Sequence, residues 1–100
     1  MPIREEDIRK ILSGLTKYEG VEYVVLADDA GFPLSSTIEP AKAEVISALV
    51  TSMLGKVNSI LKELNLSRAK ILVIRTDDRE ILVTPHEGAN LVVVRRLAKK

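Results

Sequence analysis

Two neighbouring acids and a glycine, at the end of an apolar run, are the first residues of this chain whose types suggest chemistry. They lie in the stretch ADDAGFPLSS, at positions 27–36. A calcium loop would need further oxygen ligands at alternate positions, and a phosphate loop would need more glycines and a lysine. Neither pattern is present. Because Asp tolerates left-handed backbone angles and Gly adopts positive φ without steric cost, Asp28, Asp29 and Gly31 predict a hairpin turn with solvated acids.

The other candidates for catalysis lack the partners that a reaction needs. His86 is the only histidine and sits beside Pro85 and Glu87 in a predicted turn, whereas a general base needs a proton donor in reach and an orienting group. The triplet at 35–37 lacks the glycines of a nucleophile elbow, and the acids at 77–78 lie in a turn. The chain has no Cys, which excludes disulfides and zinc–sulfur sites. We therefore expect no catalytic residue, no metal site, no cofactor and no enzymatic activity.

Composition narrows the class of protein further. The 15 basic and 14 acidic residues give a net charge of +1, which argues against a nucleic-acid binder with a strongly basic face. The only basic cluster, at 95–96 and 99–100, is interpreted as a solvated tail. No apolar run approaches the roughly 20 residues that span a bilayer, and the start of the chain is too charged for a signal peptide. We expect one cytoplasmic domain, residues 1–100, without direct membrane insertion.

Hydrophobic periodicity predicts two helices and five strands. Ile8, Ile11, Leu12 and Leu15 form one apolar helical stripe, and Asn65 is expected to close the second, longer helix in a left-handed conformation. In order, the predicted elements are helix 4–18, strands 21–27 and 32–37, helix 40–64, and strands 69–75, 80–84 and 90–95.

The last three strands are joined by links too short for a crossover, which predicts an antiparallel meander. Their apolar runs, at 71–74, 81–83 and 91–94, are continuous rather than alternating, and such runs indicate burial on both faces of a sheet. The predicted fold class is therefore α+β, an antiparallel five-stranded sheet with a helix on each face.

The long helix buries more than one sheet face requires. Apolar residues fill about half of its circumference, whereas a surface helix needs a stripe of only about 100°. Beside this arc runs a ridge of small residues, Ala41, Ala48, Ser52, Gly55 and Ser59. The ridge is interpreted either as a solvated flank or as a line where another helix approaches closely, by analogy with helices in membranes.

The two predicted edge strands differ in their protection. Strand 32–37 is short and carries Pro33, as edge strands tend to, whereas the apolar segment 70–74 has no such protection. A homodimer joined strand to strand, with the long helices side by side, would cover this edge and the surplus apolar arc together. The predicted dimer interface comprises Ala48, Ser52, Gly55, Ser59, Ala69, Ile71 and Val73.

The hairpin carries a resemblance to a known family. Its pattern of Gly-Val, Val-Val-Leu, Asp and Gly-x-Pro-Leu resembles the Roadblock/dynein light chain family of the prokaryotic small-GTPase regulator type, on residues Gly20, Val21, Val24, Val25, Leu26, Asp28, Gly31, Pro33 and Leu34. The resemblance implies a homodimer or heterodimer whose sheet continues across the interface. It also implies an action on Ras-like small GTPases as activator or scaffold, as in prokaryotic members, or a place in dynein and lysosomal signalling complexes, as in eukaryotic ones. No arginine finger is carried over to this chain.

The leading hypothesis is a homodimeric interaction module that regulates or scaffolds a Ras-like small GTPase. One alternative is a light-chain-like subunit of a larger assembly, and another is a small-molecule sensor, which would need a pocket with convergent polar groups. The candidate residues for docking the GTPase lie on the polar flank of the long helix, where plain solvation is the alternative for each: Glu44, Thr51, Asn58 and Lys62.

Overall fold

The predicted elements form in the expected order. The computed structural model describes residues 5–86 and 88–97, so the predicted first residue of the opening helix, the side chain of Glu87 and the basic residues 99–100 lie outside the described part. The elements are α1 (Glu5–Thr16), β1 (Val21–Asp28), β2 (Pro33–Ser36), α2 (Pro40–Glu63), β3 (Leu72–Arg75), β4 (Arg79–His86) and β5 (Ala89–Arg96).

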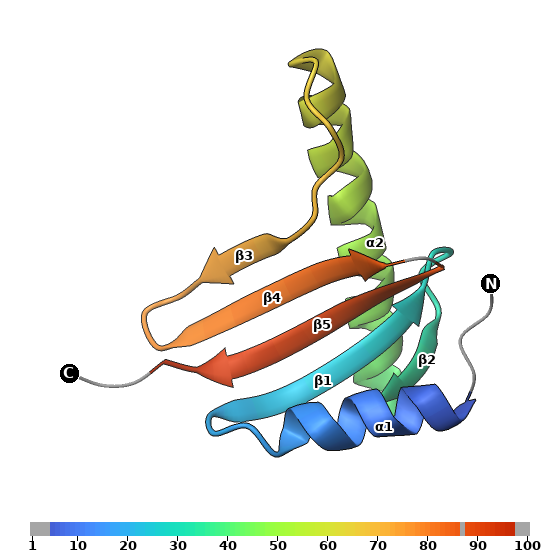
Figure 1. The fold of residues 1–100 in the computed structure, drawn as a ribbon, viewed down its shortest axis with the longest axis vertical. Helices are drawn as coiled ribbons and strands as arrows, with labels where there is room; N and C mark the ends of the chain where they lie inside the picture. Colours follow the sequence, from blue (N-terminus) through green and yellow to red (C-terminus); the bar gives the residue numbers. More distant parts are fainter. Residues whose placement is uncertain (1–4, 87, 98–100) are drawn as a thin grey trace.

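The five strands pair into one antiparallel sheet with the order β2-β1-β5-β4-β3 (Figure 1). Across the middle of the sheet, Val25 lies opposite Val92, Val92 opposite Val83, and Val83 opposite Leu72. The strands predicted to be edges, β2 with its Pro33 and β3 after the long helix, are both edges. The α+β fold class is confirmed.

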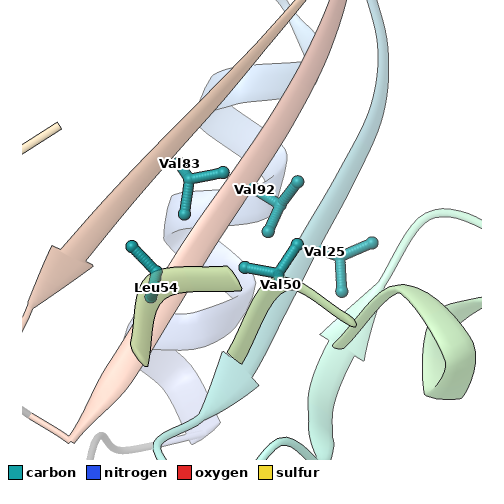
Figure 2. Close-up of a cluster of buried hydrophobic side chains, with 5 residues drawn as sticks. All are labelled: Val25, Val50, Leu54, Val83 and Val92. Carbon is teal, nitrogen blue, oxygen red and sulfur yellow. The ribbon is translucent and has the colours of Figure 1, made fainter. Parts of the chain in front are cut away.

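The face of the sheet toward α2, called here the α2 side, carries the main hydrophobic core. Figure 2 shows Val25, Val83 and Val92 from three strands meeting Val50 and Leu54 of α2. All five are at most 7% exposed, and each fully buried aliphatic side chain contributes about 1.5–3 kcal/mol of hydrophobic stabilisation. Helix α2 is therefore anchored on the middle of the sheet.

Side chains alternate across a strand, so the neighbours of this core point to the opposite face, the α1 side. There Leu26 and Ala89 are buried together, with Leu12 of α1 and Leu91 packed against them. A helix on each face explains why the strand sequences are apolar without alternation, as the three-layer prediction requires.

The acids at 28–29 form a hairpin turn, as predicted, but Asp28 is not merely solvated. Its Oδ1 accepts hydrogen bonds from the N–H groups of Ala30 and Phe32, at 3.0 and 2.9 Å. Gly31 has φ +95° and is buried against α2. Asp28 therefore holds the turn through its side chain, which is the usual action of Asp in such loops, while Asp29 is exposed.

Helix α2 ends as its sequence indicates. Asn65 adopts φ 60°, and the N–H groups of Asn65 and Leu66 donate to the carbonyls of Lys62 and Leu61. These two bonds form a Schellman motif, which satisfies the last carbonyls of a helix. The prediction that Asn65 closes the helix is confirmed.

Several element ends differ from the prediction, and the largest difference is at β3, which begins at Leu72 rather than at residue 69. The register places Leu72 opposite Val83, so residue 70 would lie opposite Pro85. Proline has no N–H for a neighbouring strand, and β4 continues beyond Val83 paired only with β5. Helix α1 ends at Thr16 instead of 18, and His86 ends β4 rather than lying in the turn.

One buried polar group lacks a partner. Ser47 of α2 is fully buried, and its Oγ has no hydrogen-bond partner among the described residues. An unsatisfied buried hydroxyl costs about 1–3 kcal/mol. We predict that Ser47→Ala raises the free energy of unfolding by about 1 kcal/mol more than Ser59→Ala does.

Ser59 is a matched control, because it lies on the same helix, is exposed, and donates its hydroxyl proton to the carbonyl of Gly55 at 2.9 Å. Both variants share the gain in helix propensity, so the difference isolates the buried hydroxyl. Urea denaturation of both variants measures it, and equal effects would contradict the prediction.

Candidate functional site

Helix α2 is too long for its own sheet. Its 24 residues span about 36 Å, whereas five strands at their usual spacing are about 19 Å wide. The buried residues of α2, namely Ala43, Ser47, Val50 and Leu54, all lie in its first 15 positions. Figure 1 shows the C-terminal part of α2 extending past β3, away from the sheet. The part after Leu54, residues 55–63, is called here the overhang, and none of its residues is buried in the described structure.

Large apolar side chains of α2 are exposed on one flank. Leu49 and Ile60 are 64% and 60% exposed, and Val45 is 57% exposed. By length and composition α2 is long and apolar enough to cross a membrane, a test that the core helix of a soluble protein also passes. Only 17% of the apolar window of α2 is buried in this structure. Because Val50 and Leu54 of the same helix anchor it on the sheet, the exposed flank indicates an interaction surface.

The outer side of β3 is the second open surface. No strand of the described chain pairs with it, so its backbone N–H and C=O groups form a template for another strand. Leu72 is half-buried toward α2, whereas Val73 on the other side is 45% exposed. The edge of β3 and the overhang lie on the same side of the molecule (Figure 1).

The small residues predicted as an interface lie on a different flank of α2. Ala48, Ser52, Gly55 and Ser59 are exposed, and the position of a Cβ on Gly55 has no atom within 4 Å. At 100° per residue, their direction differs by roughly 110° from that of Leu49, Met53 and Ile60. Ala69, Ile71 and Val73 lie along the β3 edge or just before it, so the predicted set includes the open edge of β3 but not the apolar flank of α2.

Two of the four candidate docking residues have partners within the chain. The Thr51 side chain lies under the hairpin turn, where a Cβ on Gly31 would be 3.4 Å from its Oγ1. The Asn58 Oδ1 accepts a hydrogen bond from the N–H of Ala69 at 2.9 Å. Glu44 and Lys62 are exposed. The hairpin and the segment before β3 therefore already cover part of this polar flank.

A buried carboxylate on the α1 side of the sheet was missed by sequence reasoning. The Glu80 side chain is only 2% exposed, and its two oxygens accept hydrogen bonds from Nε of Arg75 and Nε of Arg95, each at 2.7 Å. The hydrogen bonds from Arg75 and then Arg95 hold the pKa of Glu80 below its ordinary value, although burial opposes them. The only sequence signal was a glutamate at the start of an apolar strand, and its partners follow from the register.

A second carboxylate pairs with two arginines at the same end of the sheet. Glu22 accepts from Nε of Arg79 at 2.6 Å and from Nη2 of Arg96 at 3.2 Å, and the bond to Glu22 raises the pKa of Arg79. The interpretation of the basic pair at 95–96 as a solvated tail was therefore wrong, because both arginines belong to β5 and form ion pairs.

Within residues 5–86 and 88–97, no three His, Cys, Asp or Glu side chains gather as a metal site would require. Open surfaces rather than reactive groups dominate the described structure. Its order of elements, its sheet topology and its long second helix define a class of α+β domain with a five-stranded antiparallel sheet between helices.

The chain belongs to the Roadblock/LC7 domain family, whose sequence model matches residues 7–95. Solved structures share the fold. A Roadblock/LC7 domain from Streptomyces avermitilis is 20% identical, with a TM-score of 0.77 over 84% of this chain and 73% of that one. The gliding protein MglB from Thermus thermophilus is 23% identical, with a TM-score of 0.79 over 91% of this chain and 72% of that one.

A further structure, of MglB with a tetrameric arrangement, is 24% identical with a TM-score of 0.79, covering 91% of this chain and 71% of that one. No curated protein sequence matches the chain significantly. At these identities the structures establish the fold that this chain shares with them.

Glu80 generates a prediction about pH. A carboxyl whose pKa is lowered on folding stabilises the protein above its ordinary pKa, which is 4.5 for Glu, and this stabilisation is lost as the pH falls through the lowered folded value. We expect Glu80→Gln to lower the melting temperature at pH 7 and to flatten its decline between pH 5 and pH 3.

The matched control is Glu44→Gln, since Glu44 is exposed on α2. Glu44→Gln should leave the melting temperature at pH 7, and its decline between pH 5 and pH 3, close to those of the wild type. Melting curves for the wild type and Glu80→Gln that stay parallel from pH 7 to pH 3 would contradict the assigned role of Glu80.

Proposed function

We propose that this protein is a homodimer that continues its sheet through β3 and sets the two α2 helices side by side. The observation that carries the proposal is the overhang of α2 beside the unpaired edge of β3. A two-fold axis at β3 brings each overhang over the partner's sheet and satisfies the edge with backbone hydrogen bonds. The description of a relative of this fold in a tetrameric arrangement supports self-association.

The flank of α2 that meets the partner helix is the apolar one. Leu49 and Ile60 are exposed there, and Met53 between them is half-buried. On the opposite flank, Thr51 and Asn58 already contact the hairpin turn and the segment before β3. Burying Leu49, Met53 and Ile60 against their copies removes the exposed apolar surface, whereas the ridge of small residues faces away from this contact.

The dimer interface generates a prediction about self-association. Leu49 is 64% exposed, so Leu49→Lys costs the single chain little. We expect it to weaken dimerisation at least tenfold, because the ammonium group would have to be buried. Light scattering over a concentration series measures the dissociation constant.

Gly55→Leu is the discriminating control, because Gly55 has open space around it and lies on the small-residue flank. A dimer that survives Gly55→Leu but not Leu49→Lys supports the apolar flank. The reverse result would place the contact on the small residues, and a wild-type monomer at micromolar concentration would remove the dimer altogether.

The dimer is proposed to act in the cytoplasm as a non-enzymatic regulator or scaffold of a Ras-like small GTPase. Family membership supports this, since the resemblance in the hairpin implies such a partner. No arginine of this chain is proposed as a finger in the GTPase site. Acceleration of hydrolysis would then come from ordering the switch loops and the water-positioning residue of the GTPase.

The test uses purified small GTPases encoded in the same genome, loaded with GDP or with a non-hydrolysable GTP analogue. We expect the wild-type dimer to bind one nucleotide state at least tenfold more tightly in calorimetry, with GTP hydrolysis measured in parallel. Exposed Glu44 and Lys62 are the docking candidates, and Glu44→Lys should weaken binding without changing the dimer. Failure to bind in either nucleotide state would contradict the proposed function.

A further inference from the structure

A polar hollow lies beside the overhang, between the small-residue flank of α2 and the segment that leads from α2 to β3. Figure 1 shows this segment returning from the end of α2 toward β3. The hollow has a volume of about 330 Å³, which is at the lower end of the range for small-molecule sites. It is lined by Gly55, Asn58, Ser59, Lys62, Leu66, Ser67 and Arg68.

The segment that closes the hollow is fixed to α2 on both sides of residues 67–68. Before them, the N–H of Leu66 donates to the carbonyl of Leu61 at 2.8 Å. After them, the N–H of Ala69 donates to Oδ1 of Asn58 at 2.9 Å. The side chains of the segment are therefore held beside the helix rather than left on a free loop.

The small residues of α2 give the hollow its depth. Gly55 has no atom within 4 Å of the position that its Cβ would take. The hydroxyl of Ser59 turns back onto the helix and donates to the carbonyl of Gly55 at 2.9 Å. At this point the ridge of small residues leaves a space that no described side chain fills.

The hollow is positively charged. Lys62 and Arg68 line it, and the lining includes no Asp or Glu. Neither cation has an ion-pair partner among residues 5–86 and 88–97. Glu63, the acid next to Lys62 in the sequence, points about 100° away from it around α2. A cleft lined by one sign of charge attracts a ligand of the opposite sign.

Basic residues near the end of a helix commonly bind its last carbonyls, but in α2 these carbonyls are already bonded. Three backbone N–H groups, of residues 64–66, donate to the carbonyls of residues 60–62. The helix end therefore does not need Lys62 or Arg68, and both side chains are available to a ligand.

The donors of the hollow suit a phosphate group. An ammonium has three N–H donors and a guanidinium has five. The amide nitrogen of Asn58 adds two more, because Oδ1 of the same side chain already holds Ala69. These donors approach from α2 on one side and from the segment on the other. A phosphate monoester accepts from several directions through three oxygens and carries about −1.5 to −2 charges at pH 7, which matches the two cations.

We propose that this hollow binds the phosphate monoester group of a ligand through Lys62 and Arg68, with Ser67 and the amide of Asn58 as further donors. A small phosphorylated molecule and a lipid headgroup both offer this group. The helix residues of the hollow point roughly 150° away from the apolar flank of α2, so the proposed contact between α2 helices leaves the hollow open. The proposal depends on neither the dimer nor the GTPase.

The test is a titration of the isotope-labelled wild-type protein with glycerol phosphate at constant ionic strength, followed by amide chemical shifts. We expect saturable shifts at residues 58–62 and 66–69. Arg68→Gln and Lys62→Gln should each raise the dissociation constant about tenfold, since hydrogen bonds to charged groups are the strong ones. Gly55→Leu should abolish binding, because its side chain would fill the hollow.

Lys56→Gln is the matched control, because Lys56 is exposed on the same helix but does not line the hollow. This variant removes the same charge and should bind glycerol phosphate like the wild type. The proposal is overturned if Lys56→Gln weakens binding as much as Arg68→Gln does, if the shifts do not saturate, or if Gly55→Leu binds normally. Circular dichroism spectra of the variants confirm that they fold.

Vesicles distinguish the two sources of the phosphate group. Phosphatidylcholine vesicles carry either phosphatidic acid, which has a phosphate monoester, or phosphatidylserine at equal charge. Sedimentation with phosphatidic acid alone, lost in Arg68→Gln, assigns the hollow to a lipid headgroup. Saturable binding of glycerol phosphate without sedimentation assigns it to a small soluble molecule. Equal sedimentation with both lipids, or binding of neither probe, would contradict a phosphate site.

Discussion

The proposed assembly depends on one feature of the sheet, the open hydrogen-bonding edge of β3. Backbone N–H and C=O groups must find partners, and along the outer side of β3 no other part of the described chain supplies them. Both edge strands are four residues long, but β2 begins with Pro33, which has no N–H to donate, so β2 is the poorer template. The two edges of one sheet therefore differ in chemistry, and a second chain is expected to pair on the β3 side.

Helix α2 extends beyond the sheet on the same side as the open edge of β3. The part of α2 up to Leu54 is anchored on the α2 side of the sheet by Val50 and Leu54, and the overhang extends past the same edge with Ile60 exposed. The backbone edge and the apolar flank would thus be satisfied by one contact. The α1 side of the sheet is different, because it carries α1 and the two arginines that are held by Glu80.

Much of the fold follows from local sequence rules. The turn at Asp28–Gly31, the closure of α2 at Asn65 and the apolar runs of β4 and β5 all rest on residue types that act within a few positions of themselves. The late start of β3 could be predicted only from the strand register, because Pro85 of β4 limits the pairing of the neighbouring strand β3 rather than that of β4 itself. The role of Glu80 was hidden for the same reason, since Arg75 and Arg95 reach it only across the sheet. Which flank of α2 is open depends on where Gly31 and Ala69 pack, and helical periodicity cannot show that.

The most direct measurement of the central claim is amide hydrogen exchange in β3 as a function of protein concentration. Alternate amides of this strand point away from β4 and should exchange quickly in dilute solution. The account predicts that their exchange slows as concentration rises through the dimerisation range, while the amides bonded to β4 change little. Outward-facing amides that exchange equally fast at every concentration, in a protein that self-associates, would contradict pairing through this edge.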